Sequence, residues 1–412
     1  MMGGSVEIGF ASNYNADQSF RFGLPTTLLY GVDVVARELC AELAVPGAKA
    51  IALITDAGVS EAGVLDHVCH VLSAGGYTSE VYVKDRAEPT DEMVAEASVS
   101  SAVCESDTLL ALGGGGVMDL AKALRLENAG AVSGIRELEG WHDALPTNGK
   151  ALIAVPTTSG TGSESGAGAV LIHGTRREKF CVVSRSIAPD LALIDPTLTL
   201  SVPPDVTAYT GFDVLGHAMG AYLSAWSQPA TDPLALEAVR LVAANLRTAV
   251  GRGNHVEART NLSLASMIAG IAMNHADVTV EHILAETVGP FYGIPHGMAV
   301  AQALPASLEH NWIAAPSKVV RLAQAFGAPE PRTRAAAAQH LIAEVRRLAR
   351  DLAIPTPRAV GVTIDDGAEL TERALRHPNI EARTNPRLLD EAALSALLGA
   401  IAEESFAVSA DG

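Results

Sequence analysis

Residues 108–126 read TLLALGGGGVMDLAKALRL, and this stretch decides the class of fold. Its first five residues form a short apolar run typical of a buried strand, and a helical pattern opens near Val117. The four glycines between them, residues 113–116, predict a tight turn from strand to helix. Because bare backbone N–H groups at the start of a helix can hold a phosphate, the turn is a candidate nucleotide-binding loop.

The glycine turn departs from the common nucleotide fingerprints. Met118 stands where the GxGxxG pattern needs its last glycine, and no Gly-Lys-Ser/Thr follows as in a P-loop. The turn also does not lie in the first strand-helix unit, so a Rossmann-type site would have to be rearranged. A plain tight turn therefore stays open as an alternative.

Strands and helices alternate on both sides of this stretch, which predicts a parallel sheet covered by helices. Further strand-like runs lie at 50–55, 79–83, 151–155 and 191–194, and helical stretches at 61–72 and 91–102. After Asp195-Pro196 the strand-like runs almost disappear and helical periodicity takes over. We expect an α/β dinucleotide-binding domain over residues 1–198 and an all-α domain over residues 199–412, with a cleft between them.

The composition restricts the class of protein. The chain has 412 residues, of which 48% are apolar and 18% charged, and this suits two globular domains. Forty-seven acidic residues against 29 Lys and Arg give a formal net charge of −18, which disfavours nucleic acids and anionic membranes as partners. We find no signal peptide and no apolar stretch of about 18 residues. The four cysteines lack the spacing of a disulfide framework or a zinc ribbon, so we expect a cytoplasmic protein.

Two polar features beside strand ends strengthen the nucleotide prediction. Residues 156–164, PTTSGTGSE, place hydroxyl groups and glycines directly after a strand, where they suit a phosphate or a ribose. Asp56 ends an early strand, and its carboxylate could bind an adenosine ribose while repelling a 2′-phosphate, which favours NAD(H) over NADP(H). Asp56 could equally be the N-cap of the next helix, and that alternative stays open.

Candidate metal ligands lie in the second half of the chain. Asp213 and His217 are four residues apart in a helical stretch, so their side chains project from one face. His282 lies on a later helix, and His296 sits between a proline and a glycine where another helix begins. Three imidazoles and one carboxylate suit Fe(II) or Zn(II) and leave room for a substrate oxygen. Spacing alone does not select these three histidines from the twelve in the chain.

Taken together, these separated motifs resemble the iron-containing, group III alcohol dehydrogenases over essentially the full chain. The segments that carry the resemblance are residues 113–122, similar to the family's GGGSxxDxAK loop; residues 156–164, similar to PTTxGTGSE; residues 195–199, similar to DPxLT; residues 211–222, similar to GxDALxHAxExY; His282 and residues 295–297 at the family spacing; and residues 385–387, similar to NPR. Such an ordered set is specific to the family.

The resemblance implies a cofactor and a metal that meet between the two domains, in an architecture like that of dehydroquinate synthase. It implies reversible hydride transfer between NAD(P)H and a small aldehyde whose oxygen the metal polarises. The implied metal ligands are Asp213, His217, His282 and His296. The candidate dinucleotide-binding residues are Asp56, Gly113, Gly114, Gly115, Gly116, Asp119, Thr157, Thr158, Thr161 and Lys179. For Lys179 the alternative is a solvated surface residue.

Two residues depart from the family pattern. Glu286 stands where many members carry a second histidine, and there it could repel an anionic substrate, add a fifth ligand or relay a proton; a surface acid is the alternative. Gly220 replaces the glutamate of HAxExY, which would widen the pocket or loosen a helix. The candidate catalytic residues are therefore His282 as a ligand and Glu286 and His275 as proton donors, with water or a ribose hydroxyl as alternatives.

The resemblance leaves the substrate open among small alcohols and aldehydes, including lactaldehyde and anionic aldehydes such as a semialdehyde or a phosphonate aldehyde. It also implies a homo-oligomer, with a dimer expected first. A dehydroquinate synthase-like lyase that uses NAD and zinc is one alternative, and a maleylacetate-type reductase, which lacks the full ligand set, is another. A non-catalytic dinucleotide or metal sensor is the third.

Overall fold

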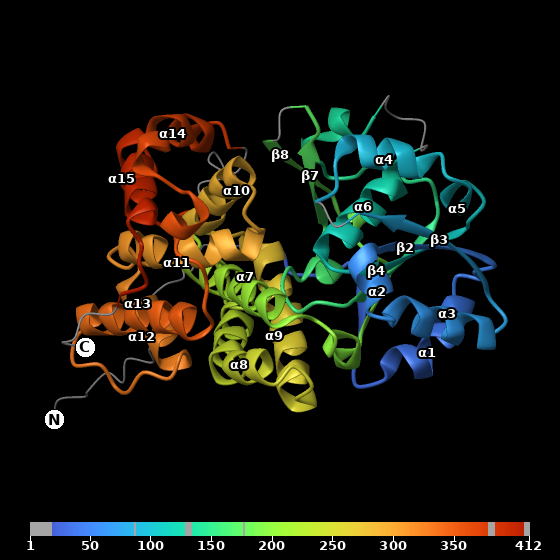
Figure 1. Ribbon diagram of the computed structural model, residues 1–412, viewed down its shortest axis with the longest axis horizontal. Helices are drawn as coiled ribbons and strands as arrows, with labels where there is room; N and C mark the ends of the chain where they lie inside the picture. The colour runs from blue at the N-terminus through green and yellow to red at the C-terminus, as the bar shows by residue number, and fades with distance from the viewer. Residues whose placement is uncertain (1–18, 86–87, 128–133, 176–177, 378–383, 408–412) are drawn as a thin grey trace.

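The computed structural model describes residues 19–85, 88–127, 134–175, 178–377 and 384–407. An α/β half and a helical half lie side by side, as Figure 1 shows. This arrangement confirms the predicted fold class, a parallel α/β domain followed by a helical one. None of the described helices combines the length and the apolar character that a membrane crossing requires.

Six parallel strands form the central sheet, in the order β1-β9-β6-β4-β2-β3. Their bounds are β1 Thr27–Tyr30, β2 Ala50–Asp56, β3 Thr78–Lys84, β4 Thr108–Gly113, β6 Ala151–Pro156 and β9 Leu191–Ile194. The strands β4 and β9 are buried at every residue because helices cover both faces of the sheet. The chain runs from β2 outward to β3 and then returns to β4 on the other side, so the carboxyl ends of β2 and β4 frame a crevice suited to a ligand.

Two layers of helices cover this sheet, and a small second sheet lies beside it. The helices are α1 Val34–Ala44, α2 Ala57–Glu61, α3 Val64–Ala74, α4 Asp91–Ser98, α5 Ser101–Cys104 and α6 Gly115–Leu126. Residues of α1 and α3 share one core cluster with the sheet, and residues of α4 and α6 share another. The second sheet consists of β5 Gly140–Trp141, β7 Gly168–His173 and β8 Glu178–Val183, with β7 and β8 antiparallel.

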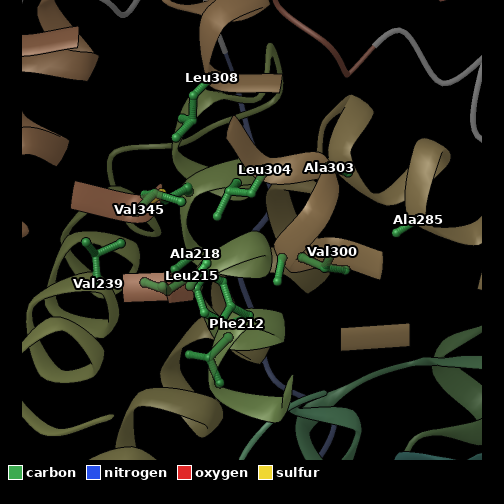
Figure 2. Close-up of a cluster of buried hydrophobic side chains, with 14 of the residues drawn as sticks. Phe212, Leu215, Ala218, Val239, Ala285, Val300, Ala303, Leu304, Leu308 and Val345 are labelled. Atoms are coloured by element: carbon green, nitrogen blue, oxygen red, sulfur yellow. The ribbon is translucent and has the colours of Figure 1, made fainter. Parts of the chain in front are cut away.

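The remaining helices form the second half of the molecule. They are α7 Pro204–Leu223, α8 Asp232–Gly251, α9 Val256–Ala276, α10 Val280–Tyr292, α11 His296–Asn311, α12 Pro316–Ala325, α13 Arg334–Asp351, α14 Gly367–Leu375 and α15 Glu391–Ala402. The central helix is α7, which is buried along most of its length. Figure 2 shows Phe212, Leu215 and Ala218 of α7 packed in one apolar cluster with side chains of α8, α11 and α13. Buried polar side chains on so apolar a helix need partners, which directs attention to Asp213 and His217.

Candidate active site

A cavity of about 790 Å³ lies between the two halves of the chain. The α/β half contributes Gly115, Gly116 and Lys179 to its wall, and the helical half contributes Asp213, His282 and Glu286 among others. The residues predicted to bind a dinucleotide and those predicted to bind a metal therefore meet at one cavity. A site between two domains is a common location for a substrate and its cofactor.

The four predicted metal ligands converge in the wall of this cavity. Asp213 and His217 come from α7, His282 from α10, and His296 from the first residue of α11. The Nε2 atoms of His217, His282 and His296 lie 3.9, 3.7 and 3.4 Å from Oδ1 of Asp213. The ring of His282 stacks on that of His217, with centroids 4.6 Å apart, and lies 5.5 Å from that of His296. Three elements distant in sequence thus point nitrogen atoms at one carboxylate oxygen.

The residues at this cluster fit a divalent cation. One ligand atom from each of Asp213, His217 and His282 lies within 4.8 Å of the others. Oδ1 of Asp213 and Nε2 of His282 are buried and have no hydrogen-bond partner among the described residues. Since an unpaired buried polar atom is costly, an arrangement that leaves two of them facing each other suits an ion that binds both. Imidazole and carboxylate donors together suit iron or zinc.

Burial and charge set the protonation of these ligands in the metal-free chain. Burial lowers the pKa of His217 to about 4, so its ring is neutral near pH 7 and can donate a lone pair. Burial also acts to lower the pKa of His282, but the nearby carboxylates of Asp213 and Glu281 outweigh this and raise the pKa to about 10. The charges of the histidines hold the pKa of Asp213 far below its usual value despite its burial. The carboxylate is therefore ionised and ready to bind a cation.

The glycine loop packs tightly against the PTTSGTGSE segment. Gly113 ends β4 and Gly115 begins α6, so the strand-to-helix turn predicted over residues 113–116 is observed, but the helix begins two residues earlier than expected. A Cβ atom on Gly115 would lie 2.6 Å from Cγ2 of Thr161, and one on Gly114 would lie 3.2 Å from Oγ1 of Thr158. Gly115, Gly116 and Thr161 line the cavity. The first N–H groups of α6 have no intrahelical partners, so this is where a phosphate would be held.

Asp119 and Thr157 are engaged in holding this segment. Asp119 accepts hydrogen bonds from Oγ of Ser163 at 2.8 Å and from the backbone N–H of Val170 at 3.2 Å, and it lies on the cavity wall. The backbone N–H of Thr157 donates to the carbonyl of Gly113 at 3.0 Å. These contacts give both residues a role in the shape of the loop, and a contact with the dinucleotide stays a prediction.

Asp56 is the N-cap of α2. Its Oδ1 accepts a hydrogen bond of 3.0 Å from the backbone N–H of Val59, so the alternative left open by the sequence is observed. The residue ends β2 at the carboxyl edge of the sheet, the edge at which the neighbouring strand β4 ends in the glycine loop. A ribose contact of the second carboxylate oxygen stays a prediction.

Lys179 is a buried cavity residue rather than a solvated one. Its side chain is 9% exposed, and Nζ lies 3.1 Å from Oε1 of Glu88. Burial acts to lower its pKa, but the charges of Glu88 and Glu286 raise it above the ordinary lysine value. Lys179 therefore places a positive charge on the wall of the cavity that the glycine loop and the candidate metal ligands also line.

Glu286 is paired with a histidine that the sequence did not single out. Its Oε2 lies 2.7 Å from Nε2 of His377, which follows α14. Burial acts to raise the pKa of Glu286, but the hydrogen bond and charge of His377 hold it far below the usual value, with Lys179 adding to the effect. Glu286 lines the cavity as an ionised carboxylate, so it is not a surface acid.

His275 lines the same cavity, but both of its ring nitrogens are occupied. Nδ1 donates to the carbonyl of Ile271 at 2.8 Å, since a carbonyl oxygen can only accept, and Nε2 accepts from the backbone N–H of Gly23 at 3.2 Å. Phe22 stacks on the ring at 4.4 Å. The ring has no free nitrogen in this arrangement, and a role for His275 in proton transfer stays a prediction. The ring joins the segment before β1 to α9.

Comparisons with known proteins identify the family of the chain. The family model described as iron-containing alcohol dehydrogenase matches residues 25–196, and the C-terminal model of the Fe-containing alcohol dehydrogenase family matches residues 207–402. The choline dehydrogenase of Bacillus subtilis is 34% identical over 90% of this chain and 92% of its own. A solved 1,3-propanediol oxidoreductase has a TM-score of 0.86 at 32% identity, covering 93% of this chain and 100% of its own. The sulfoacetaldehyde reductase of Bifidobacterium kashiwanohense, solved with NAD+, has a TM-score of 0.82 at 27% identity, covering 94% of this chain and 99% of its own.

These matches decide between the families considered. Both family models are those of alcohol dehydrogenases, which favours that assignment over a dehydroquinate synthase-like lyase. The four candidate ligands lie together, whereas a maleylacetate-type reductase would lack the full set. The chain belongs to the iron-containing alcohol dehydrogenase family and is an oxidoreductase that acts on alcohols.

Proposed function

We propose that this chain oxidises small alcohols with NAD and reduces the matching aldehydes with NADH, using one divalent cation held by Asp213, His217, His282 and His296. The observation that carries the proposal is the convergence of three imidazoles on one buried carboxylate oxygen, in a cavity that the glycine loop also lines. When bound, the cation supplies Lewis acidity to the reacting oxygen, and Fe(II) and Zn(II) both suit the donors.

NAD(H) is the coenzyme that we propose over NADP(H). A carboxylate at the end of β2 would accept hydrogen bonds from a ribose and repel a 2′-phosphate. Asp56 supplies that carboxylate, with one oxygen committed to the N-cap of α2. The similar sulfoacetaldehyde reductase was solved with NAD+. We propose that the pyrophosphate lies against the glycine loop and that Thr157, Thr158 and Lys179 lie toward the nicotinamide.

Glu286, held by His377, is the group that we propose for proton transfer. Oxidation of an alcohol sends a hydride to the coenzyme and releases the hydroxyl proton. Glu286 lies one helical turn after His282, lines the cavity and is hydrogen-bonded to His377. As an ionised carboxylate it can accept the proton, while the hydrogen bond from His377 holds the carboxylate in position. His275 is the weaker candidate because both of its ring nitrogens are bonded to backbone groups.

The size and charge of the cavity bear on the substrate. The nicotinamide end of the coenzyme shares the space, which leaves room for a small alcohol. Arg21 and Arg185 are exposed residues of the cavity wall, and they support anionic aldehydes within the proposed range. Asp277 and Glu286 line the same cavity as acids, and Oδ2 of Asp277 is buried with no hydrogen-bond partner among the described residues. The charge of the substrate is therefore the property to measure first.

A screen with substrates matched in size tests the proposal. Initial rates of NAD+ and NADP+ reduction are compared for choline, neutral 3,3-dimethylbutan-1-ol, 1,3-propanediol and anionic isethionate, with protein stripped and then reloaded with Fe(II) or Zn(II). We expect turnover of at least one of these alcohols with NAD+, and rates with NADP+ at least tenfold lower. Equal rates with NADP+ would overturn the coenzyme preference. NADH binding without turnover in either direction would instead favour the sensor.

We further propose a cytoplasmic homo-oligomer, with a dimer expected first. All four cysteines are unpaired thiols in the structure, as expected in a reducing compartment. The oligomer rests on the family resemblance, and light scattering on eluted protein measures it directly. A species of twice the chain mass would support the dimer, and a monomer at micromolar concentration would contradict it.

A further inference from the structure

A buried glutamate lies directly behind one of the metal ligands. Glu281 precedes His282 in the first turn of α10 and is 1% exposed. Its Oε1 accepts from the backbone N–H of Thr279 at 2.9 Å and lies 3.3 Å from Nδ1 of His282. Its Oε2 accepts from the hydroxyl of Thr279 and, at 2.8 Å, from that of Ser307 in α11. Both carboxylate oxygens are therefore bonded, and the side chain has one fixed position.

This contact determines which nitrogen of His282 is available to a metal. An ionised carboxylate can only accept a hydrogen bond, so the proton of the ring lies on Nδ1. Nε2 is then the nitrogen whose lone pair a cation would use once the ring is neutral, and it faces Oδ1 of Asp213 at 3.7 Å with no hydrogen-bond partner of its own among the described residues. A carboxylate behind a ligating imidazole fixes its tautomer and orientation and makes it a stronger ligand.

The space for this carboxylate exists because residue 220 has no side chain. A Cβ atom on Gly220 would lie only 2.4 Å from Oε1 of Glu281, which is too close for two non-bonded atoms. It would also lie 3.2 Å from the backbone nitrogen of Thr279, which is a tight contact. Gly220 lies on α7 one turn beyond His217, so the carboxylate fills the gap between the two helices that carry the ligands. Gly220 and Glu281 are thus complementary, and neither loosening of α7 nor a wider pocket is needed to explain the glycine.

We propose that Glu281 is a positioning residue of the metal centre, which holds His282 with Nε2 toward the cation, and that Gly220 is the residue that makes room for it. The proposal rests on the metal site proposed above. Glu281 does not line the cavity and does not face the reacting atoms, so it acts through His282 alone. Its loss should therefore weaken metal binding and change the geometry around the metal, with a smaller effect on NADH binding.

Titration of the stripped full-length chain with Co(II), followed by its visible absorption, tests this role. We expect the wild-type chain to bind one equivalent. Glu281→Gln, which keeps the size of the side chain, should weaken Co(II) binding about 10- to 100-fold and alter the absorption bands. Gly220→Ala should act in the same direction by displacing the carboxylate. When Gly220→Ala is combined with Glu281→Ala, the Co(II) affinity should fall little below that of Glu281→Ala alone, because no carboxylate is left to displace.

A buried glutamate far from the metal provides the control. Glu404 is also buried in the helical half and is bonded by Arg346 and by the backbone N–H of Phe406. Glu404→Gln should lower thermal stability while leaving Co(II) affinity and spectrum unchanged. If Glu281→Gln binds Co(II) within twofold of wild type with the same spectrum, the positioning role is wrong and the metal site stands. If the wild-type chain binds no Co(II), both the site and the role of Glu281 are overturned.

Discussion

His282 lies between the other proposed metal ligands, with its ring stacked on that of His217 and its Nε2 3.7 Å from Oδ1 of Asp213. We expect His282→Ala to abolish metal-dependent turnover, because a cation would lose one of its nitrogen donors. NADH binding should remain measurable, since the glycine loop belongs to the other half of the chain. Fluorescence titration with NADH and the rate of NAD+ reduction on one sample check both statements. Full activity of this variant would refute the ligand assignment.

Gly115 is a residue of the glycine loop with no room for a side chain. A Cβ atom there would lie 2.6 Å from Cγ2 and 2.8 Å from Oγ1 of Thr161. Gly115→Ala should therefore push the loop away from Thr161 and raise the KM for NAD+ about tenfold or more, which is about 1.4 kcal/mol of binding. Gly367→Ala is the matched control, since Gly367 also begins a helix but has open space around it. An unchanged KM for Gly115→Ala would contradict the close packing of the loop.

The sequence predicts which site residues lie together when they are only a few positions apart in the chain. Asp213 and His217 share a helix face by their separation of four, and the structure brings them together. The histidines at 282 and 296 join them only through the packing of α10 and α11 on α7, which spacing does not reveal. His377 and Glu281 carry no motif at all. The one available signal was an acid directly before His282 in an apolar stretch, where burial without a partner would be costly.

The Glu286–His377 contact joins α10 to the segment after α14, so its loss should weaken the packing of these two elements on each other. Because the pKa of Glu286 is held below its unfolded value, the pair adds stability that is fully present above about pH 4.3 and is lost as the pH falls through the folded-state pKa. We expect Glu286→Gln to lower the free energy of unfolding by about 2 kcal/mol at pH 7. The difference from wild type should shrink as the pH falls below about 4.

An exposed ion pair in the same region serves as the control for this variant. Glu372 pairs with Arg376 across one helical turn, and both side chains are more than half exposed. Glu372→Gln should change stability by less than about 0.5 kcal/mol. Urea unfolding at several pH values measures both variants. A loss for Glu286→Gln that grows as the pH falls would contradict the assigned sign.

Two glycines let the halves of the molecule approach each other at the level of the backbone. Gly162 has a φ of 62° in the PTTSGTGSE segment, and a Cβ atom on Gly270 of α9 would lie 2.7 Å from its carbonyl oxygen. Gly270→Ala should force the segment and α9 apart and cost about 1–3 kcal/mol. Gly251→Ala, at the end of α8 where nothing lies within 4 Å, should be neutral within about 0.5 kcal/mol. Equal stabilities of the two variants would show that this contact is not tight.

At the scale of elements, continuous buried strands were the easiest to predict and breaks in helices the hardest. The strands β2, β3, β4, β6 and β9 lie where the apolar runs place them. The predicted helix at 61–72 is instead α2 and α3, separated at Gly63 with its φ of 75°. The predicted helix at 91–102 is α4 and α5, because Ser100 caps a new helix. Periodicity continues across such breaks, and only the local backbone shows them.

At the scale of the whole molecule, the two proposed binding sites come from different halves of the chain. The α/β half contributes the glycine loop proposed for the dinucleotide, the helical half contributes the four proposed metal ligands, and both line one cavity. The architecture follows from the switch between alternating strands and helices and the run of helices after residue 199. The cavity could not be predicted from the sequence in this way, because it depends on how the two halves pack against each other. The central claim is that turnover requires both halves but that each binds its own group independently.

The measurement that tests this claim most directly is metal removal and return, with coenzyme binding and turnover followed on the same sample. The stripped protein should bind NADH with the same affinity as the metal-loaded protein but should reduce no aldehyde. Activity should return with added Fe(II) or Zn(II) and level off at one equivalent per chain. At a free metal concentration about 100 times its Kd, the metal should also stabilise the fold by about 2.7 kcal/mol. Unchanged turnover in the stripped protein would contradict the account.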